Sequence, residues 1–159
     1  MKEHKQESKT RTKTIVITGA SDGIGKAAAK QLKYDGHNVI IVGRSEEKTK
    51  LVATDLDVPF YIADFSKLED VRKLAKALIK DIPSIDVLCN NAGGIMSERS
   101  LTVDGNEQTM QVNHYAPFLL TNLLMEKLIK SKASVINTAS VANTLLSDFD
   151  INDFDLKKG

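Results

Sequence analysis

Three glycines within the stretch TGASDGIG (18–25) could bind a phosphate group. Gly19, Gly23 and Gly25 stand between a short β-branched run and a segment with helical periodicity. A glycine at the first position permits a tight turn, one at the second lets backbone N–H groups approach a pyrophosphate at the helix N-terminus, and one at the third lets the helix pack closely on the strand. The positions between them are occupied by Ala20, Ser21, Asp22 and Ile24. The spacing predicts a dinucleotide-binding turn; the alternative is a plain strand-to-helix turn.

A guanidinium group follows the second strand-like run. In VGRSEE, Arg44 and Ser45 stand about 20 residues after the glycines, where an acidic side chain would accept from the ribose 2′-hydroxyl of NAD. A guanidinium group suits a 2′-phosphate and cannot accept a hydrogen bond. We therefore predict NADP(H) in preference to NAD(H); the alternative is that Arg44 is a solvated residue at a helix start.

A carboxylate closes the third strand-like run, in the stretch ADFS. Asp64 could accept from the exocyclic amine of an adenine ring, with the backbone of Phe65 beside it. The residue could equally serve the entry to the next helix, since Ser66 and Glu69 have the spacing of a capping box. The sequence leaves these two interpretations open.

Two further polar residues could take part in proton transfer. Pro117 follows Asn113 by four residues, and because proline has no N–H, the Asn113 carbonyl would lose its helix partner and could bind water or an ammonium group. The alternative is a kinked packing helix with an incidental Asn. Ser140 ends a strand-like run that we expect to be buried, but a lone hydroxyl needs a general acid or base beside it.

Strand-like and helix-like segments alternate along the chain and would position these residues. The strand-like runs are 14–18, 38–43, 59–64, 85–89 and 133–139, and the helix-like segments are 23–36 with Gly36 as a C-terminal cap, one beginning near Glu46, 66–80, and a long one over 107–130. This alternation is typical of an α/β fold with a parallel sheet covered by helices on both faces.

Composition narrows the function classes. The length of 159 residues suits one domain, and a net charge of +1 argues against partners such as nucleic acid or a membrane surface. The single cysteine excludes an internal disulfide, and no Cys/His cluster has metal-ligand spacing, so we expect no metal and a cytoplasmic location. We divide the chain into a basic tail (1–13), a nucleotide-binding domain (14–147) and an acidic loop (148–159).

The motifs, taken together, resemble the short-chain dehydrogenase/reductase family. TGASDGIG is followed by CNNAGG (89–94), VNHYAPFLLTNLLM and VINTAS, in order and at suitable spacing. The segment SLTVDGNEQTMQVNHYAPFLLTNLL is similar to the retinol-dehydrogenase-like branch of that family. The resemblance implies a Rossmann-type doubly wound sheet with strand order 3-2-1-4-5, and hydride transfer between a nicotinamide and an alcohol or carbonyl carbon of a small molecule.

The resemblance also implies roles for individual residues. Asn90 and Asn91, with Ala92 and Gly93, would lie along the cofactor and stabilise the central sheet. Asn113 and Ser140 would match the family's catalytic Asn and Ser.

The family's Tyr and Lys, spaced Y-x-x-x-K, do not occur in this sequence. The three tyrosines are followed four residues later by Asn38, Phe65 and Leu119. The interpretations left open are a C-terminally truncated NADP-dependent oxidoreductase, a catalytically inactive NADP-binding module acting as a sensor or scaffold, and a half-site completed by another polypeptide. We also expect strand 133–139 to form a bare edge and the leucines of 107–130 to expose an apolar patch, so that the chain is marginally stable or self-associates.

Overall fold

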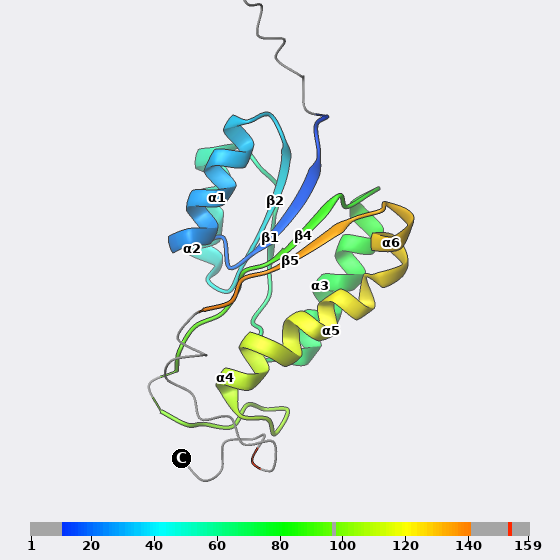
Figure 1. Cartoon of the computed structure of the whole chain (residues 1–159). Helices are drawn as coiled ribbons and strands as arrows, with labels where there is room; N and C mark the ends of the chain where they lie inside the picture. The colour runs from blue at the N-terminus through cyan, green and yellow to red at the C-terminus, as the bar shows by residue number, and fades with distance from the viewer. Residues whose placement is uncertain (1–10, 97, 141–152, 154–159) are drawn as a thin grey trace, which may run out of the picture.

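A five-stranded sheet forms the centre of the molecule (Figure 1). The computed structural model describes residues 11–96, 98–140 and 153, so most of the expected tail and the acidic loop lie outside the described residues. The strands run in the order β3-β2-β1-β4-β5, and every neighbouring pair is parallel, which confirms the expected topology. Their bounds are β1 Thr14–Thr18, β2 Asn38–Gly43, β3 Phe60–Ile62, β4 Val87–Asn90 and β5 Ser134–Asn137.

Helices cover both faces of the sheet (Figure 1). On one face lie α1 (Gly23–Tyr34) and α2 (Glu46–Leu56); on the other lie α3 (Leu68–Asp81), α4 (Gln108–Met110), the π-helical turn η1 (Gln111–Tyr115), α5 (Ala116–Leu123) and α6 (Met125–Lys130). Each face has its own apolar core. Val16 and Leu88 belong to the core under α3 and α5, whereas Ile15 and Ile17 belong to the core under α1 and α2, because side chains alternate along a strand.

The prediction that Ser66 caps the N-terminus of α3 is wrong. The helix begins at Leu68, and its N-cap residue, Lys67, makes no side-chain capping bond. The Leu68 N–H instead donates to the Asp104 carboxylate at 2.9 Å. A residue 36 positions away therefore satisfies one of the helix's unpaired donors.

The long helix expected over 107–130 is interrupted. It begins with Glu107, whose carboxylate accepts from the Met110 N–H at 2.7 Å, and it widens at η1. The Ala116 N–H donates to the Gln111 carbonyl, five residues back. Pro117 follows at once and has no N–H to continue the helical hydrogen bonds. The widened turn includes Asn113, whose carbonyl was predicted to lose its helix partner.

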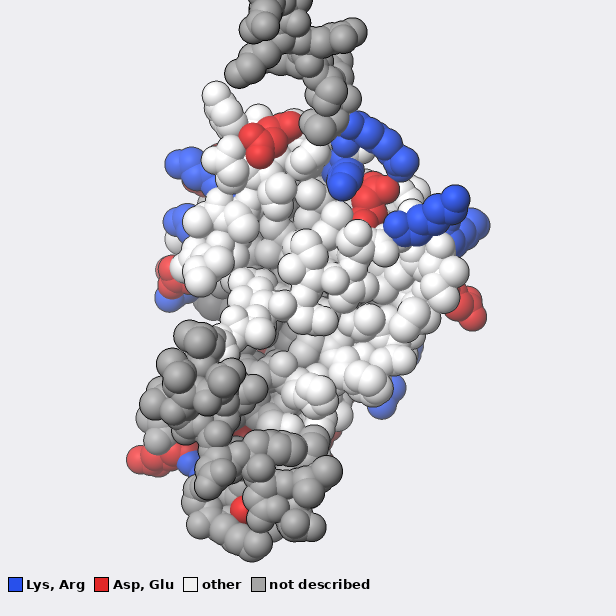
Figure 2. Space-filling model, viewed as in Figure 1, with Lys and Arg blue, Asp and Glu red and all other residues white. Residues whose placement is uncertain are grey.

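Strand β5 is at an edge of the sheet, as expected, but it is not buried. Val135 and Ile136, whose side chains point to opposite faces, are 39% and 53% exposed. The prediction of an exposed leucine patch is also wrong, because Leu120, Leu124 and Leu128 are buried and the other leucines of α5 pack against the core. The exposed apolar side chains of these two helices are Phe118, Met125 and Ile129. Figure 2 shows few charged side chains on the face that carries β5.

Candidate functional site

A cleft of about 540 Å³ opens at the carboxyl ends of the first four strands. A cleft of this size is typical of small-molecule sites, and its position beside β1 and β4, where the strand order reverses, is typical of nucleotide binding in open parallel sheets. Nine of the residues expected to bind a cofactor line it: Gly19, Ser21, Asp22, Arg44, Ser45, Asp64, Phe65, Ala92 and Gly93. The other lining residues were not predicted from the sequence; they are Val42, Gly43, Lys48, Ala63, Gly94, Ile95, Met96 and Val112.

The turn between β1 and α1 requires its glycines. Gly19 has φ +67°, and a Cβ there would lie 2.7 Å from the Cα of Ala92. A Cβ at Gly25 would overlap the carbonyl oxygen of Gly19 and the Nδ2 atom of Asn91. The helix therefore approaches the strand as closely as the sequence analysis predicted.

The N-terminus of α1 presents unpaired donors. The Asp22 carboxylate accepts from the Gly23 N–H at 2.8 Å, while the N–H groups of Ile24 and Gly25 have no acceptor among the described residues. α1 has twelve residues, so its dipole adds to the attraction for an anion. These two N–H groups are what a pyrophosphate at this turn would need.

Asn91 supports the cleft and does not line it. Its Nδ2 donates to the Thr18 carbonyl at 3.0 Å, and its backbone N–H donates to the Thr18 hydroxyl, also at 3.0 Å. The same hydroxyl accepts from the Ala92 N–H at 3.0 Å. The carboxyl ends of β1 and β4 are thus tied together, and the backbone of Ala92 and Gly93 is held along the cleft.

Cations gather at the end of the cleft beside α2. Arg44 is exposed and has no ion pair or hydrogen bond within the described part of the chain. Ser45 caps α2 by accepting from the Lys48 N–H at 3.3 Å. The Lys48 ammonium lies 3.4 Å from the Asp22 carboxylate. The pKa of Asp22 is lowered, first by the Gly23 N–H bond and then by Lys48. Lys48 stands one helical turn after Arg44, a spacing that could have revealed it from the sequence.

Asp64 shapes the entry to α3, one of its two expected roles. Its Oδ1 accepts from the Ser66 N–H at 3.0 Å and from the Ser66 hydroxyl at 2.8 Å, which makes a compact turn before α3. The residue also lines the cleft. Its neighbour Phe65 is buried, and the Phe65 carbonyl accepts from the Gln111 side chain at 3.4 Å.

Asn113 holds the opposite wall of the cleft. Its Oδ1 accepts from the Gly94 N–H and its Nδ2 donates to the Gly94 carbonyl, both at 2.9 Å. A Cβ at Gly93 would lie 3.0 Å from the same Oδ1. Ser140 is exposed, follows β5 and is not among the residues that line the cleft. The structure therefore places Asn113 against the cleft wall without bringing Ser140 to it.

None of the tyrosines lines the cleft. The Tyr61 hydroxyl donates to the Asp81 carboxylate at 3.2 Å, and burial together with that carboxylate raises the pKa of Tyr61. Tyr34 is 86% exposed, and Tyr115 packs edge-on against His114. No side chain in the cleft therefore has the position of a phenolic acid–base group.

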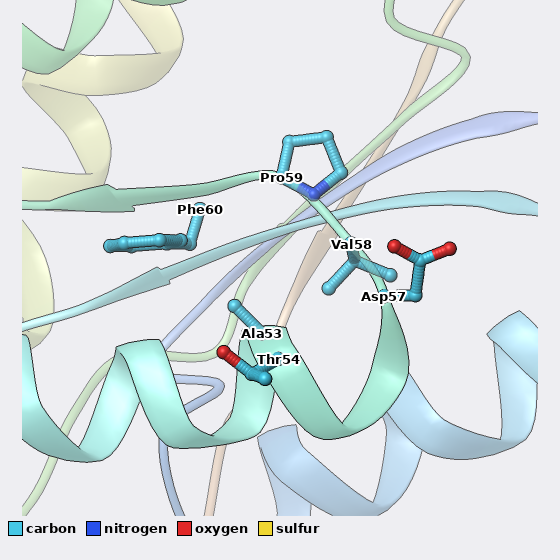
Figure 3. Close-up of a pocket in the computed structure, with 6 residues that line it drawn as sticks. All are labelled: Ala53, Thr54, Asp57, Val58, Pro59 and Phe60. Atoms are coloured by element: carbon cyan, nitrogen blue, oxygen red, sulfur yellow. The ribbon is translucent and has the colours of Figure 1, made fainter.

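A second hollow lies between α2 and β3 (Figure 3). It is lined by Ala53, Thr54, Asp57, Val58, Pro59 and Phe60, of which only Asp57 is ionisable.

Among the described residues no cluster of His, Cys, Asp and Glu could hold a metal ion. None of the helices that the structure describes combines the length and the apolar character needed to cross a bilayer.

Comparisons with known proteins agree with this geometry. A model of the family described as short chain dehydrogenase matches residues 13–147. Retinol dehydrogenase 11 of Homo sapiens is 40% identical over 141 residues, which cover 84% of this chain and 44% of that protein. Retinol dehydrogenase 13 of Homo sapiens is 38% identical over 139 residues, covering 82% of this chain and 42% of that protein. A solved structure of an Escherichia coli CFT073 protein complexed with NADPH is similar with a TM-score of 0.73 and 34% identity, over 85% of this chain and 61% of that one. The chain thus spans less than half the length of these two curated relatives.

Proposed function

Because this chain belongs to the short-chain dehydrogenase/reductase family, where it is similar to the retinol dehydrogenases, we propose that it binds NADP(H) in the cleft described above. We propose further that it is the cofactor-binding part of an oxidoreductase that transfers a hydride between the nicotinamide and an alcohol or carbonyl carbon. The retinol dehydrogenase relatives favour a lipophilic small molecule as the substrate.

The observation that carries this proposal is a set of unpaired donors at and beside the cleft: Arg44 lines it, and Ile24 and Gly25 follow its lining residue Asp22 at the start of α1. The N–H groups of Ile24 and Gly25 can take a pyrophosphate, and Arg44 can take a 2′-phosphate. Asp64 can accept from the adenine amine through the carboxylate oxygen that does not serve the turn before α3. The complex of the Escherichia coli relative with NADPH supports the same choice of cofactor.

The glycine turn also fits the shape of such a ligand. A side chain at Gly19 or Gly25 would collide with the protein itself, whereas the position of a Cβ at Gly23 meets no atom within 4 Å. The backbone at the N-terminus of α1 therefore remains open to a phosphate.

The chain's own residues suggest what each would do in the reaction. The bound nicotinamide would supply or take up the hydride. Asn113, through its two bonds to Gly94, would fix the wall beside which the nicotinamide lies, and its main chain at the π-helical turn would hold a water for proton transfer. The family resemblance, and no contact with the cleft, is the basis for proposing that Ser140 holds the substrate oxygen.

The alternative is an NADP-binding module that performs no turnover. It rests on the tyrosines of this sequence, none of which is followed four residues later by a lysine that could help supply the proton and hold the ribose. The two proposals are separated by assaying NADPH-linked reduction of a generic aldehyde by the purified chain. Turnover by this chain alone would exclude the inactive module, whereas tight NADPH binding without turnover would fit either the module or a cofactor-binding part that another segment or polypeptide completes.

Cofactor binding itself is tested by titrating NADPH and NADH against the purified chain. We expect NADPH to bind more tightly, and we expect Arg44→Asp to reverse that preference, because it replaces a phosphate-binding group with an acceptor for the ribose hydroxyl. Equal affinities, or tighter binding of NADH, would contradict the assignment to NADP(H). An unchanged preference in Arg44→Asp would exclude Arg44 as its cause.

A further inference from the structure

Two residues that line the cleft together with Arg44 form an ion pair. It joins Asp22, in the turn after β1, to Lys48, on the first turns of α2, with 3.4 Å between the ammonium and carboxylate groups. Both side chains are well exposed, at 77% for Asp22 and 63% for Lys48, and an exposed pair of this kind contributes little to stability. Breaking such an ion pair costs little free energy. Because both residues line the cleft, one of them can leave its partner and bind a ligand instead.

The two partners of the pair differ in how firmly they are held. The Asp22 carboxylate is fixed at the N-terminus of α1 because its Oδ1 accepts from the Gly23 N–H at 2.8 Å, while its Oδ2 faces Lys48. The Lys48 ammonium has no other partner among the described residues and stands at the end of a flexible stem. Lys48 is therefore the partner that can move.

The Lys48 side chain starts from the first turn of α2, directly after the proposed phosphate-binding residue Arg44 and the N-cap residue Ser45. Arg44 precedes it by four residues, and the Ser45 hydroxyl accepts from the Lys48 backbone N–H at 3.3 Å, which leaves the hydroxyl hydrogen to donate elsewhere. A phosphate monoester carries about −1.5 to −2 charges near neutral pH and takes up several donors. One guanidinium group alone would leave part of that charge unbalanced.

On the basis of the proposed function, we propose that Lys48 is a second cation for the 2′-phosphate of the dinucleotide and that Asp22 weakens phosphate binding by competing for Lys48. The affinity for the phosphate is then set by three side chains, with Arg44 and Lys48 attracting it and Asp22 opposing it. The Asp22–Lys48 pair of the free protein would open as the phosphate binds.

The test measures binding of 2′,5′-ADP and of ADP to the purified chain by isothermal titration calorimetry at low salt. The first nucleotide carries a 2′-phosphate and the second does not. We expect Lys48→Met to weaken 2′,5′-ADP binding about tenfold, the value of one charge-assisted contact, and to leave ADP binding unchanged. Lys50→Met, on the same helix but outside the cleft, is the matched control and should behave as wild type.

The opposing role of Asp22 has its own variant. We expect Asp22→Asn to tighten 2′,5′-ADP binding about threefold, because it releases Lys48, while an Asn side chain can still cap α1. In the Lys48→Met background, this gain should shrink. A Lys48→Met variant with unchanged affinity for 2′,5′-ADP would overturn the proposal, and so would an Asp22→Asn variant that binds no more tightly.

These results are separable from a failure of the proposed function. If wild type binds 2′,5′-ADP no better than ADP, the assignment to NADP(H) fails and the inference fails with it. If wild type prefers 2′,5′-ADP and loses that preference in an Arg44 variant but not in Lys48→Met, the proposed function stands and only the role of Lys48 is overturned. Thermal denaturation of each variant confirms that it is folded.

Discussion

Replacing Gln111 by Leu should destabilise the protein strongly. Gln111 is fully buried at the start of η1, and its Nε2 donates to the Asp104 carboxylate at 2.9 Å and to the Phe65 carbonyl at 3.4 Å. Its Oε1 accepts from the Thr102 hydroxyl at 2.7 Å and from the Asn106 amide at 2.8 Å. This one side chain therefore joins the loop before α4 to Phe65, which lines the cleft.

The magnitude follows from these bonds. Leu has nearly the same volume as Gln, so the cost is the loss of polar partners, without a cavity term. Each hydrogen bond contributes about 1 kcal/mol net, and a buried group left unpaired costs about 1–3 kcal/mol. Counting the three bonds at or below 2.9 Å, we expect a loss of about 3 kcal/mol. In a domain of this size each kcal/mol lowers Tm by about 2–4 °C, so the Tm should fall by about 6–12 °C.

Urea and thermal denaturation, followed by circular dichroism, measure this change. Asp104→Asn is the matched control, because an amide oxygen can still accept from both Gln111 and the Leu68 N–H, and it should cost less than about 1 kcal/mol. The reasoning is refuted if Gln111→Leu melts within about 2 °C of wild type, or if Asp104→Asn proves as costly as Gln111→Leu.

Three further changes should have measurable effects. Gly25→Ala should abolish NADPH binding in a fluorescence titration and lower Tm, because its Cβ would overlap the glycine turn; binding at wild-type strength would contradict the close approach. Because the pKa of Tyr61 is raised, the folded state holds the phenol proton more tightly than the unfolded state does, so stability should fall as pH rises above about 10. That fall should be smaller in Tyr61→Phe, and denaturant titrations with identical slopes for the two proteins would argue against it. If the exposed apolar side chains of α5 and α6 drive self-association, Ile129→Lys should lower the sedimentation coefficient at high concentration, and a monomeric wild type would remove the premise.

Local sequence determined the alternation of strands and helices and the turn after β1. Apolar periodicity needs only a short window, and the strain of a left-handed backbone at Gly19 is a property of that residue and its neighbours. The Gly36 cap, at φ +83°, is confirmed for the same reason. The position of Arg44 directly after β2 could likewise be predicted from the sequence alone.

Tertiary packing decided which side chains meet. α3 is capped by Asp104, which is 36 residues away, and no spacing rule connects it to Leu68. Burial of Gln111 follows from the docking of two loops that share no local pattern.

Contacts at the cleft and exposure at the edge of the sheet also depend on tertiary packing. The pairing of Asp22 with Lys48 exists because β1 and β2 are neighbours, which brings the turn after one strand against the helix after the next. The edge position of β5 was predicted, but its apolar run does not show how far the side chains are buried, and only the folded structure shows that Val135 and Ile136 are exposed. Backbone conformation is encoded by near neighbours, whereas partners and burial depend on residues that only the folded sheet brings together.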